Sequence, residues 1–187
     1  MIPKYVFFTK GVGTHKKELQ SFELALRDAK ISEYNLVPVS SILPPLVKEL
    51  SVDEGIHHLR PGQIVYLVLA RNCSNEKNRL VSASIGVAKP KDNSTYGYLS
   101  EHHSFGQDCR TAGDFSEDLA ASMLASALGI PFDIDAAYDE KREIFMMSDK
   151  IVETKNITSC VAVEHDGIFT TVIAAAVFDF GFHQYWV

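Results

Sequence analysis

The sequence predicts an α+β fold in a single domain covering residues 1–187, and three observations lead to this prediction. The length of 187 residues suits one compact domain. Hydrophobic residues make up 46% of the chain and charged residues 22%, which is ordinary for a globular protein and argues against a disordered chain or a coiled coil. The predicted elements run strand, helix, several strands, helix, strands, an order that favours antiparallel pairing over a regular βαβ array.

The first part of the chain predicts two strands around a helix. Aromatic residues and Val predict a short strand over residues 5–9, which Gly11-Val12-Gly13 should end in a tight turn, since glycine reaches positive φ without strain. Residues 34–39 predict the second strand, and Pro44-Pro45 excludes regular structure soon after it. Apolar residues at helical spacing predict that one face of the intervening helix is buried: Leu19, Phe22, Leu26 and Ala29.

The middle of the chain predicts three strands. Residues 63–70 are almost wholly apolar, which is typical of a strand buried on both faces. Residues 81–88 alternate between larger apolar residues and small ones, so another element should pack closely on the small face. Residues 89–93 predict a turn, and residues 96–103 predict the returning strand.

The last part predicts a helix and two strands. A helix is expected over residues 114–128, begun by the capping pair Asp114 and Glu117 and ended by Gly129 and Pro131. Two apolar runs, 157–164 and 168–178, are joined by His165-Asp166-Gly167, an arrangement typical of a β-hairpin. The charged segment 132–155 predicts a solvated helix or a loop.

Charge and cysteine content exclude several classes of function. The chain has 18 Lys and Arg against 24 Asp and Glu, a net charge of -6, which disfavours a nucleic-acid binder. The three cysteines, Cys73, Cys109 and Cys160, are odd in number and widely spaced, which predicts neither a disulfide framework nor a zinc site. The most apolar stretch, residues 172–178, is too short to span a bilayer. We therefore expect a soluble cytoplasmic protein without a membrane or nucleic-acid partner.

Other motifs point to no metal or nucleotide. Gly11-Val12-Gly13 lacks the third glycine of a dinucleotide-binding loop and the GKS/T of a P-loop. His102 and His103 are neighbours in a predicted strand, so their side chains should leave opposite faces, and no HExxH motif is present. No metal site is expected.

Two carboxylates have a structural explanation by default. Glu101 lies in a predicted strand beside the two histidines, where a carboxylate usually faces solvent, although its surroundings could tune it as a general acid or base. Glu23 lies early in a predicted helix, where the helix dipole favours negative charge.

The pair Ser40-Ser41 fits a backbone-cleavage site. It follows a predicted strand and precedes Pro44-Pro45, which would stiffen the far side. A serine hydroxyl held over the preceding carbonyl can attack it and exchange the amide for an ester. Elimination then leaves a dehydroalanine, which hydrolyses to a pyruvoyl group. The reaction needs a strained peptide and a polarising hydrogen bond on the attacked carbonyl.

The segments around this pair resemble the pyruvoyl-dependent arginine decarboxylases. The resemblance covers nearly the full chain, and the serine-pair block, residues 35–45, is its specific part. The supporting segments are Gly11-Val12-Gly13, residues 21–29, residues 82–92, Gly97-Tyr98-Leu99-Ser100-Glu101, Val161-Ala162-Val163-Glu164-His165 and Ala174-Ala175-Ala176.

The resemblance implies self-cleavage between Ser40 and Ser41. Residues 1–40 would become a β chain and residues 41–187 an α chain, with Ser41 converted to a covalent pyruvoyl cofactor. No metal and no PLP would be needed. The implied fold is a four-layer αββα sandwich with largely antiparallel sheets. The implied assembly is a homotrimer or a hexamer of two trimers, with active sites between subunits.

The resemblance also implies roles for single residues. Ser41 is the pyruvoyl precursor, Asn35 lies near the pyruvoyl, and Glu101 is the proton donor. Glu23 falls at the position of the carboxylate that binds the substrate guanidinium. The implied reaction converts L-arginine to agmatine and CO2 through a Schiff base between the pyruvoyl group and the α-amino group, with the cofactor taking up electrons much as PLP does.

Three alternatives stay open from the sequence. The same chemistry could act on ornithine, lysine or histidine. The chain could be an unprocessed paralogue that serves as a structural or regulatory subunit. It could also be an N-terminal-nucleophile hydrolase, in which Ser41 keeps its hydroxyl and attacks amides.

Overall fold

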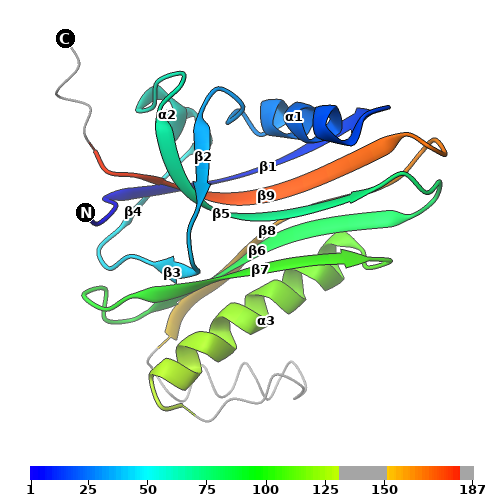
Figure 1. The fold of residues 1–187 in the computed structure, drawn as a ribbon. Coiled ribbons are helices and arrows are strands. Elements are labelled where there is room, and N and C mark those ends of the chain that lie inside the picture. The colour runs from blue at the N-terminus through cyan, green and yellow to red at the C-terminus, as the bar shows by residue number, and fades with distance from the viewer. Residues whose placement is uncertain (131–150, 182–187) are drawn as a thin grey trace.

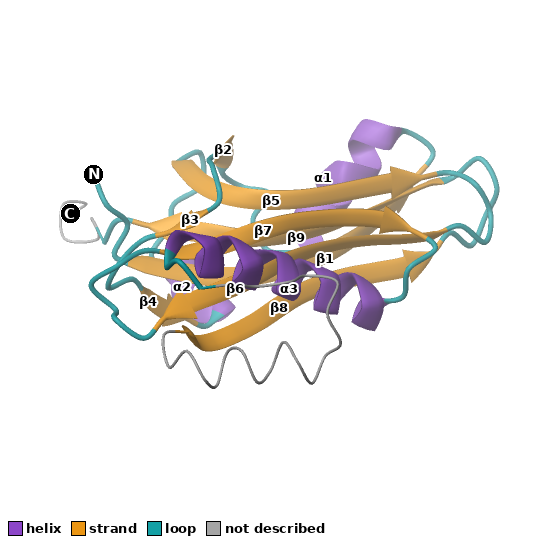
Figure 2. Ribbon diagram, turned by 90° about the horizontal axis from the view of Figure 1, so that it is seen from below, coloured by secondary structure: helices purple, strands orange, loops and turns teal. Residues whose placement is uncertain are grey.

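The computed structural model describes residues 1–130 and 151–181. Two β-sheets pack face to face, and helices cover the outer face of each (Figure 1). The view from below shows the same layers, with α3 on the outside of one sheet and α1 on the far side of the other (Figure 2). The α+β prediction is confirmed, and the layers follow the αββα order.

The strands divide into a five-stranded and a four-stranded sheet. The five-stranded sheet has the order β2-β5-β9-β1-β4 and contains β2 (Asn35–Pro38), β5 (Ile64–Ser74), β9 (Phe169–Asp179), β1 (Tyr5–His15) and β4 (Lys48–Leu50). The four-stranded sheet has the order β3-β7-β6-β8 and contains β3 (Ile42–Leu43), β7 (Gly97–Phe105), β6 (Leu80–Pro90) and β8 (Ile151–Ala162).

Pairing is largely antiparallel. Strand β9 runs antiparallel to both β1 and β5, and β6 runs antiparallel to both β7 and β8. Only the short outer strands pair in parallel, β2 with β5 and β4 with β1. Strand β2 therefore enters the five-stranded sheet at its edge, from which the chain can leave for the other sheet.

In the part of the chain that the structure describes, three helices cover the two sheets. Helix α1 (Glu18–Asp28) and the short helix α2 (Val52–His57) lie on the outer face of the five-stranded sheet. Helix α3 (Cys109–Ala127) lies across β6, β7 and β8 on the outer face of the other. The small face predicted for β6 is thereby explained, because α3 packs on it.

Among the described residues three cores result from this layering, and the smallest lies between α3 and the four-stranded sheet, with Ala88, Ala120, Ala121 and Leu124. The largest core fills the space between the sheets, where Val68, Ile85, Leu99 and Ala174 are fully buried. A second core lies between the five-stranded sheet and its two helices and includes Phe7 and other buried residues of β5 and β9.

The prediction of a tight turn at Gly11-Val12-Gly13 is wrong. Strand β1 continues through both glycines to His15, so the strand predicted over residues 5–9 is twice as long as expected. A Cβ atom on Gly11 would lie 2.1 Å from the carbonyl oxygen of Ala25, and one on Gly13 would lie 2.1 Å from that of Ser21. The glycines are therefore needed because α1 packs directly on the strand. Leu19, predicted to be buried, is 77% exposed, and Ser21 and Ala25 face the strand instead.

Helix α3 begins before the predicted start at Asp114. Its N-cap is Asp108, whose side chain accepts a hydrogen bond from the Thr111 N–H. The sequence did not indicate this earlier start, because Gly113 lies within the helix and glycine is unfavourable there. A Cβ atom on Gly113 would lie 2.5 Å from Oδ1 of Asn156, so close packing on β8 requires the glycine. The predicted end at Gly129, with a φ of 67°, is confirmed.

The hairpin predicted around His165-Asp166-Gly167 is also wrong. The two strands it joins, β8 and β9, belong to different sheets. The turn itself is present, with Gly167 at a φ of 75° and the Ile168 N–H donating to the carbonyl oxygen of His165. Both strands direct apolar residues into the core between the sheets. Two strands of one hairpin would show the same apolar pattern as two strands that lie in opposite sheets.

The expectation that the cysteines form no disulfide needs correction. Cys109, at the start of α3, is bonded to Cys160 of β8, and Cys73 is free. The two bonded residues are 51 positions apart in the sequence, so only the fold brings them together. Location in the cytoplasm stays a prediction.

Within the described ranges, no helix is long and apolar enough to cross a membrane. Most of the segment 132–155 lies outside the described residues, and its last part forms the beginning of β8.

Candidate active site

The Ser40-Ser41 pair lies where the chain passes from one sheet to the other. Strand β2 ends at Pro38 in the five-stranded sheet, and β3 begins at Ile42 in the four-stranded sheet (Figure 1). Ser40 is exposed and Ser41 is half-buried. The bond between them is therefore part of a short bridge between two rigid layers.

Backbone hydrogen bonds fix the bridge at both ends. The N–H of Val39 donates to the carbonyl oxygen of Leu67 in β5 at 2.9 Å. The N–H of Leu99 in β7 donates to the carbonyl oxygen of Ser41, also at 2.9 Å. Only Ser40 lies between these two anchored residues, so the bond that joins Ser40 to Ser41 has little freedom to relax.

The carbonyl of Ser40 is itself polarised. Its oxygen accepts a hydrogen bond from the N–H of Ile42 at 2.9 Å. Among the described residues, the structure gives the side-chain hydroxyls of Ser40 and Ser41 no hydrogen-bond partner. An uncommitted hydroxyl beside a polarised carbonyl is the arrangement that attack by Ser41 on the preceding residue requires.

Strand β7 brings Glu101 to the same corner. Ile42 and Leu43 pair with Tyr98 and Gly97, so β3 covers only the beginning of β7. Glu101 follows Leu99 by two residues, about 7 Å along the strand, and its side chain leaves the same face of β7 as that of Leu99. Since Leu99 is buried in the core between the sheets, Glu101 lies at the rim of that core, past the point where β3 ends.

The surroundings of Glu101 favour its protonated form. Partial burial raises the pKa of the Glu101 carboxyl above its ordinary value, and His103 on the same face of the strand lowers it to a smaller extent. Its direct neighbour in β6, Ile85, is fully buried and apolar. Although Glu101 as a whole residue is exposed, the buried part of its side chain lets the carboxyl hold its proton at a higher pH than a fully solvated carboxyl would.

An apolar groove of about 460 Å³ adjoins the serine pair. Val39 and Ile42, the residues on either side of the pair, both line it, and Tyr66 and Phe180 form part of its wall. The edge-to-face contact between Tyr66 and Phe180, with ring centroids 5.7 Å apart, closes one side.

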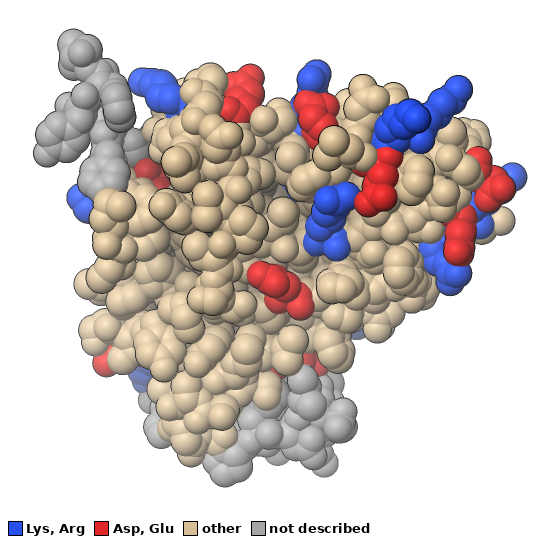
Figure 3. All heavy atoms as spheres, viewed as in Figure 1, with Lys and Arg blue, Asp and Glu red and all other residues tan. Residues whose placement is uncertain are grey.

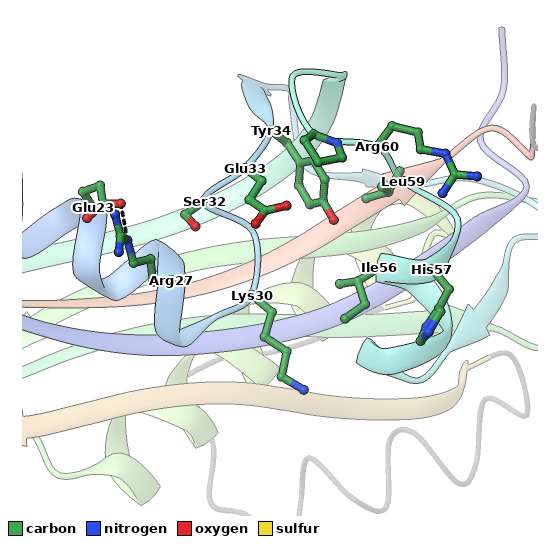
Figure 4. Close-up of a pocket in the computed structure, with 11 residues that line it drawn as sticks. Glu23, Arg27, Lys30, Ser32, Glu33, Tyr34, Ile56, His57, Leu59 and Arg60 are labelled. Carbon is green, nitrogen blue, oxygen red and sulfur yellow. Dashed lines mark hydrogen bonds and ion pairs between the residues drawn. The ribbon is translucent and has the colours of Figure 1, made fainter. Parts of the chain in front are cut away.

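Glu23 and Asn35 lie elsewhere: Glu23 lines a cleft of about 830 Å³ on the helical side of the five-stranded sheet, and Asn35 is not among its lining residues. Figure 4 shows Glu23 and Arg27 of α1 at one end of this cleft and His57 and Arg60 at the other. Asn35, the residue after the lining residue Tyr34, begins β2 and is exposed.

Both of these predicted residues have partners in their own chain. The carboxylate of Glu23 accepts a hydrogen bond from Nε of Arg27 at 2.5 Å, one turn further along α1. The side-chain amide of Asn35 donates to the carbonyl oxygen of Gly62 at 2.7 Å. Between Asn35 and Val39 the extended chain covers about 13 Å, and Ser41 is further still. The predicted site residues thus form two groups on one chain.

Sequence reasoning missed the backbone donors of this corner. The N–H groups of Ile42 and Leu99 hold the carbonyl oxygens of Ser40 and Ser41, one on each side of the peptide bond that joins the pair. Backbone groups carry no residue-type signal, so only the paired register of β3 and β7 could have pointed to them.

Comparison with known proteins shows the family of the chain. A sequence model of the family described as pyruvoyl-dependent arginine decarboxylase matches residues 5–181. The chain belongs to that family.

Relatives that are named pyruvoyl-dependent arginine decarboxylases resemble the chain over nearly its full length. A protein of Chlorobaculum tepidum named as a probable member is 58% identical over 176 residues, which cover 94% of this chain and 97% of that protein. A probable member from Chloroherpeton thalassium is 56% identical over the same shares. The pyruvoyl-dependent arginine decarboxylase of Methanococcoides burtonii is 53% identical over 178 residues, 95% of this chain and 99% of that protein. The resemblance noted from the sequence is confirmed at the level of the family.

Proposed function

We propose that this chain is a pyruvoyl-dependent decarboxylase that converts L-arginine to agmatine and CO2. Self-cleavage between Ser40 and Ser41 would give a β chain of residues 1–40 and an α chain of residues 41–187. The observation that carries the proposal is the anchoring of the serine pair to two different sheets, through Val39 on one side and Ser41 on the other, in a chain that belongs to this family.

The residues around Ser41 fit the cofactor that the family name implies. Ser41, Leu99 and Glu101 would all belong to the α chain after cleavage. The hydrogen bond from the Leu99 N–H to the Ser41 carbonyl therefore does not depend on the bond that is cut. A pyruvoyl group at residue 41 would supply a carbonyl that condenses with the α-amino group of the substrate and takes up the electron pair released with CO2. The β7 strand would keep residue 41 beside Glu101.

Glu101 would donate the proton that replaces the lost carboxyl group on the substrate α-carbon. Donation requires the protonated carboxyl, and the raised pKa of Glu101, caused by partial burial, acts in that direction.

A neighbouring subunit would complete the site. Glu23 and Asn35 form a separate group from Ser41 and Glu101 on one chain, and a second copy could present them to Ser41, as expected for a homotrimer or a hexamer of two trimers. The face over β2, β3 and β7 is nearly free of Lys, Arg, Asp and Glu, whereas charged side chains gather near α1 (Figure 3). A surface with few charges suits burial against another subunit. In the assembly, the Glu23 carboxylate would pair with the substrate guanidinium.

The test is CO2 release from arginine, ornithine, lysine and histidine, each labelled in the carboxyl carbon. The proposal predicts turnover of arginine at a kcat/KM at least tenfold above that of the other three. Equal turnover of lysine would contradict recognition of the guanidinium. No release from any of them by a cleaved protein would contradict decarboxylation of these amino acids.

A further inference from the structure

The peptide carbonyl of Ser40 lies at the opening of a tight three-residue turn. Its oxygen accepts the N–H of Ile42, two residues along the chain, at 2.9 Å, with Ser41 at the centre. The φ angle of Ser41 lies outside the positive range. A bond of this spacing with a central residue of negative φ is an inverse γ-turn, a conformation found at strand ends.

The N–H of Ile42 is available for this bond because of the register between β3 and β7. In an antiparallel pair, N–H groups of alternate residues point toward the partner strand and away from it. Ser41 bonds to Leu99 of β7, so the next residue, Ile42, is opposite Tyr98 and directs its N–H away from β7. That N–H donates its hydrogen bond to the Ser40 carbonyl oxygen instead of to a neighbouring strand.

We propose that the Ile42 N–H is the oxyanion donor for self-cleavage, the group that stabilises negative charge on the Ser40 carbonyl oxygen. The proposal rests on the cleavage assigned above. When Oγ of Ser41 attacks, a C–O bond forms to the Ser40 carbonyl carbon, the carbonyl electron pair moves onto its oxygen, and the hydroxyl proton passes to water. Collapse restores the carbonyl and breaks the C–N bond, and the Ser41 nitrogen takes up a proton. The product is an ester.

The donor acts most strongly at the moment when charge develops. A hydrogen bond to an oxyanion is roughly twice as strong as one to a neutral carbonyl. The Val39–Leu67 and Leu99–Ser41 hydrogen bonds hold the donor and the acceptor in place before the reaction begins, so no reorganisation is needed. Loss of one such donor typically slows acyl transfer by about 10²–10³-fold.

Replacement of single peptide bonds by esters tests the assignment. The full chain is made by cell-free translation with an α-hydroxy acid at position 42, which removes the N–H and keeps the side chain. A matched ester at Lys48 removes the hydrogen bond from its N–H to the carbonyl oxygen of Lys4, which has the same length but does not hold the serine pair. Ile42→Val, which keeps the N–H, controls for the side chain. Cleavage is followed over time by intact mass, which also shows where the chain is cut.

The proposal predicts that the ester at position 42 slows cleavage at least tenfold. The Lys48 ester and Ile42→Val should stay within about threefold of the unmodified chain. Cleavage of the Ile42 ester at the unmodified rate, or equal slowing by both esters, would overturn the assignment and leave the proposed function intact. An unmodified chain that never cleaves would overturn both.

Discussion

The backbone N–H of Leu99 donates a hydrogen bond to the carbonyl oxygen of Ser41 at 2.9 Å, and this bond ties the cleavage site to the strand that carries Glu101. The serine whose hydroxyl would attack and the carboxyl that would later donate a proton are therefore held by one strand. In the proposed mechanism, β7 would therefore position Ser41 for formation of the cofactor and Glu101 for the later proton transfer.

Ser41→Ala should abolish cleavage and leave a single full-length chain, because the attacking hydroxyl is gone. Ser40→Ala is the matched control, since only the carbonyl of Ser40 takes part and its side chain is exposed. We expect it to cleave within a few-fold of the natural rate. Denaturing gels over a time course compare the two, and cleavage of Ser41→Ala would remove Ser41 as the nucleophile.

Glu101→Gln should cleave normally but decarboxylate arginine about 10²–10⁴-fold more slowly, because the amide cannot donate the proton. Initial rates of agmatine formation on fully cleaved protein give the comparison. Glu76→Gln, a change at an exposed glutamate paired with Arg79, is the control and should keep full activity. Unchanged turnover in Glu101→Gln would exclude Glu101 from proton transfer.

The raised pKa of Glu101 gives a pH dependence of stability. A carboxyl whose pKa is higher in the folded state binds its proton more tightly there, so this group lowers the free energy of unfolding as pH rises. Glu101→Gln should therefore unfold at a higher temperature than the natural protein at pH 7. The difference should disappear below about pH 4, where the carboxyl is protonated in both states. Calorimetry at the two pH values measures it, and a lower unfolding temperature for the variant at pH 7 would contradict the sign.

The Glu23–Arg27 ion pair should compete with the substrate. If Glu23 binds the guanidinium, Arg27→Gln frees the carboxylate and should lower KM for arginine about twofold, as expected from the energy of an i,i+4 pair. Glu23→Gln should raise KM. Steady-state kinetics on the cleaved proteins measure KM for arginine in both variants. A KM that neither substitution changes would show that Glu23 does not bind the substrate.

Gly13→Ala should destabilise the protein by about 1–3 kcal/mol or more, because its Cβ atom would collide with the backbone of α1. Thr14→Ala, on the exposed side of the same strand, should change stability by less than about 0.5 kcal/mol. Urea unfolding of both variants tests the role of the glycine. Equal stability of the two would mean that α1 does not pack on β1 as described.

The Cys109–Cys160 disulfide should stabilise the protein by up to about 4 kcal/mol, from the loop-closure entropy of 51 residues. Thermal unfolding should therefore shift to lower temperature when a reductant is added. Cys160→Ser should show the lower value with or without reductant, and Cys73→Ser should behave like the natural protein. No effect of reductant on the natural protein would show that this bond adds nothing to stability.

The sequence predicted most of the strands and the chemistry of the serine pair, because apolar periodicity and the Ser40-Ser41 block are local signals. The prediction at Gly11 and Gly13 was wrong, because a single sequence does not distinguish a glycine on which a helix packs from a glycine that forms a turn. The sequence also predicted pairing of β8 with β9, because strands that face one core from opposite sheets show the same apolar pattern as a hairpin.

The candidate site was predictable only in its side chains. Ser41, Glu101, Glu23 and Asn35 were named from the sequence, but their division into two groups on one chain follows from β2, whose length separates Asn35 from Ser41. The donors Ile42 and Leu99 are backbone groups, whose positions depend on register.

Intact mass of the purified protein under denaturing conditions tests the central claim most directly. Self-cleavage predicts two fragments, residues 1–40 and residues 41–187, with the larger lighter by one ammonia than a fragment that begins with serine, and reactive toward a carbonyl reagent. A single uncut chain of 20.8 kDa would contradict self-cleavage. A cut chain that retains an N-terminal serine amine would contradict the formation of the pyruvoyl group.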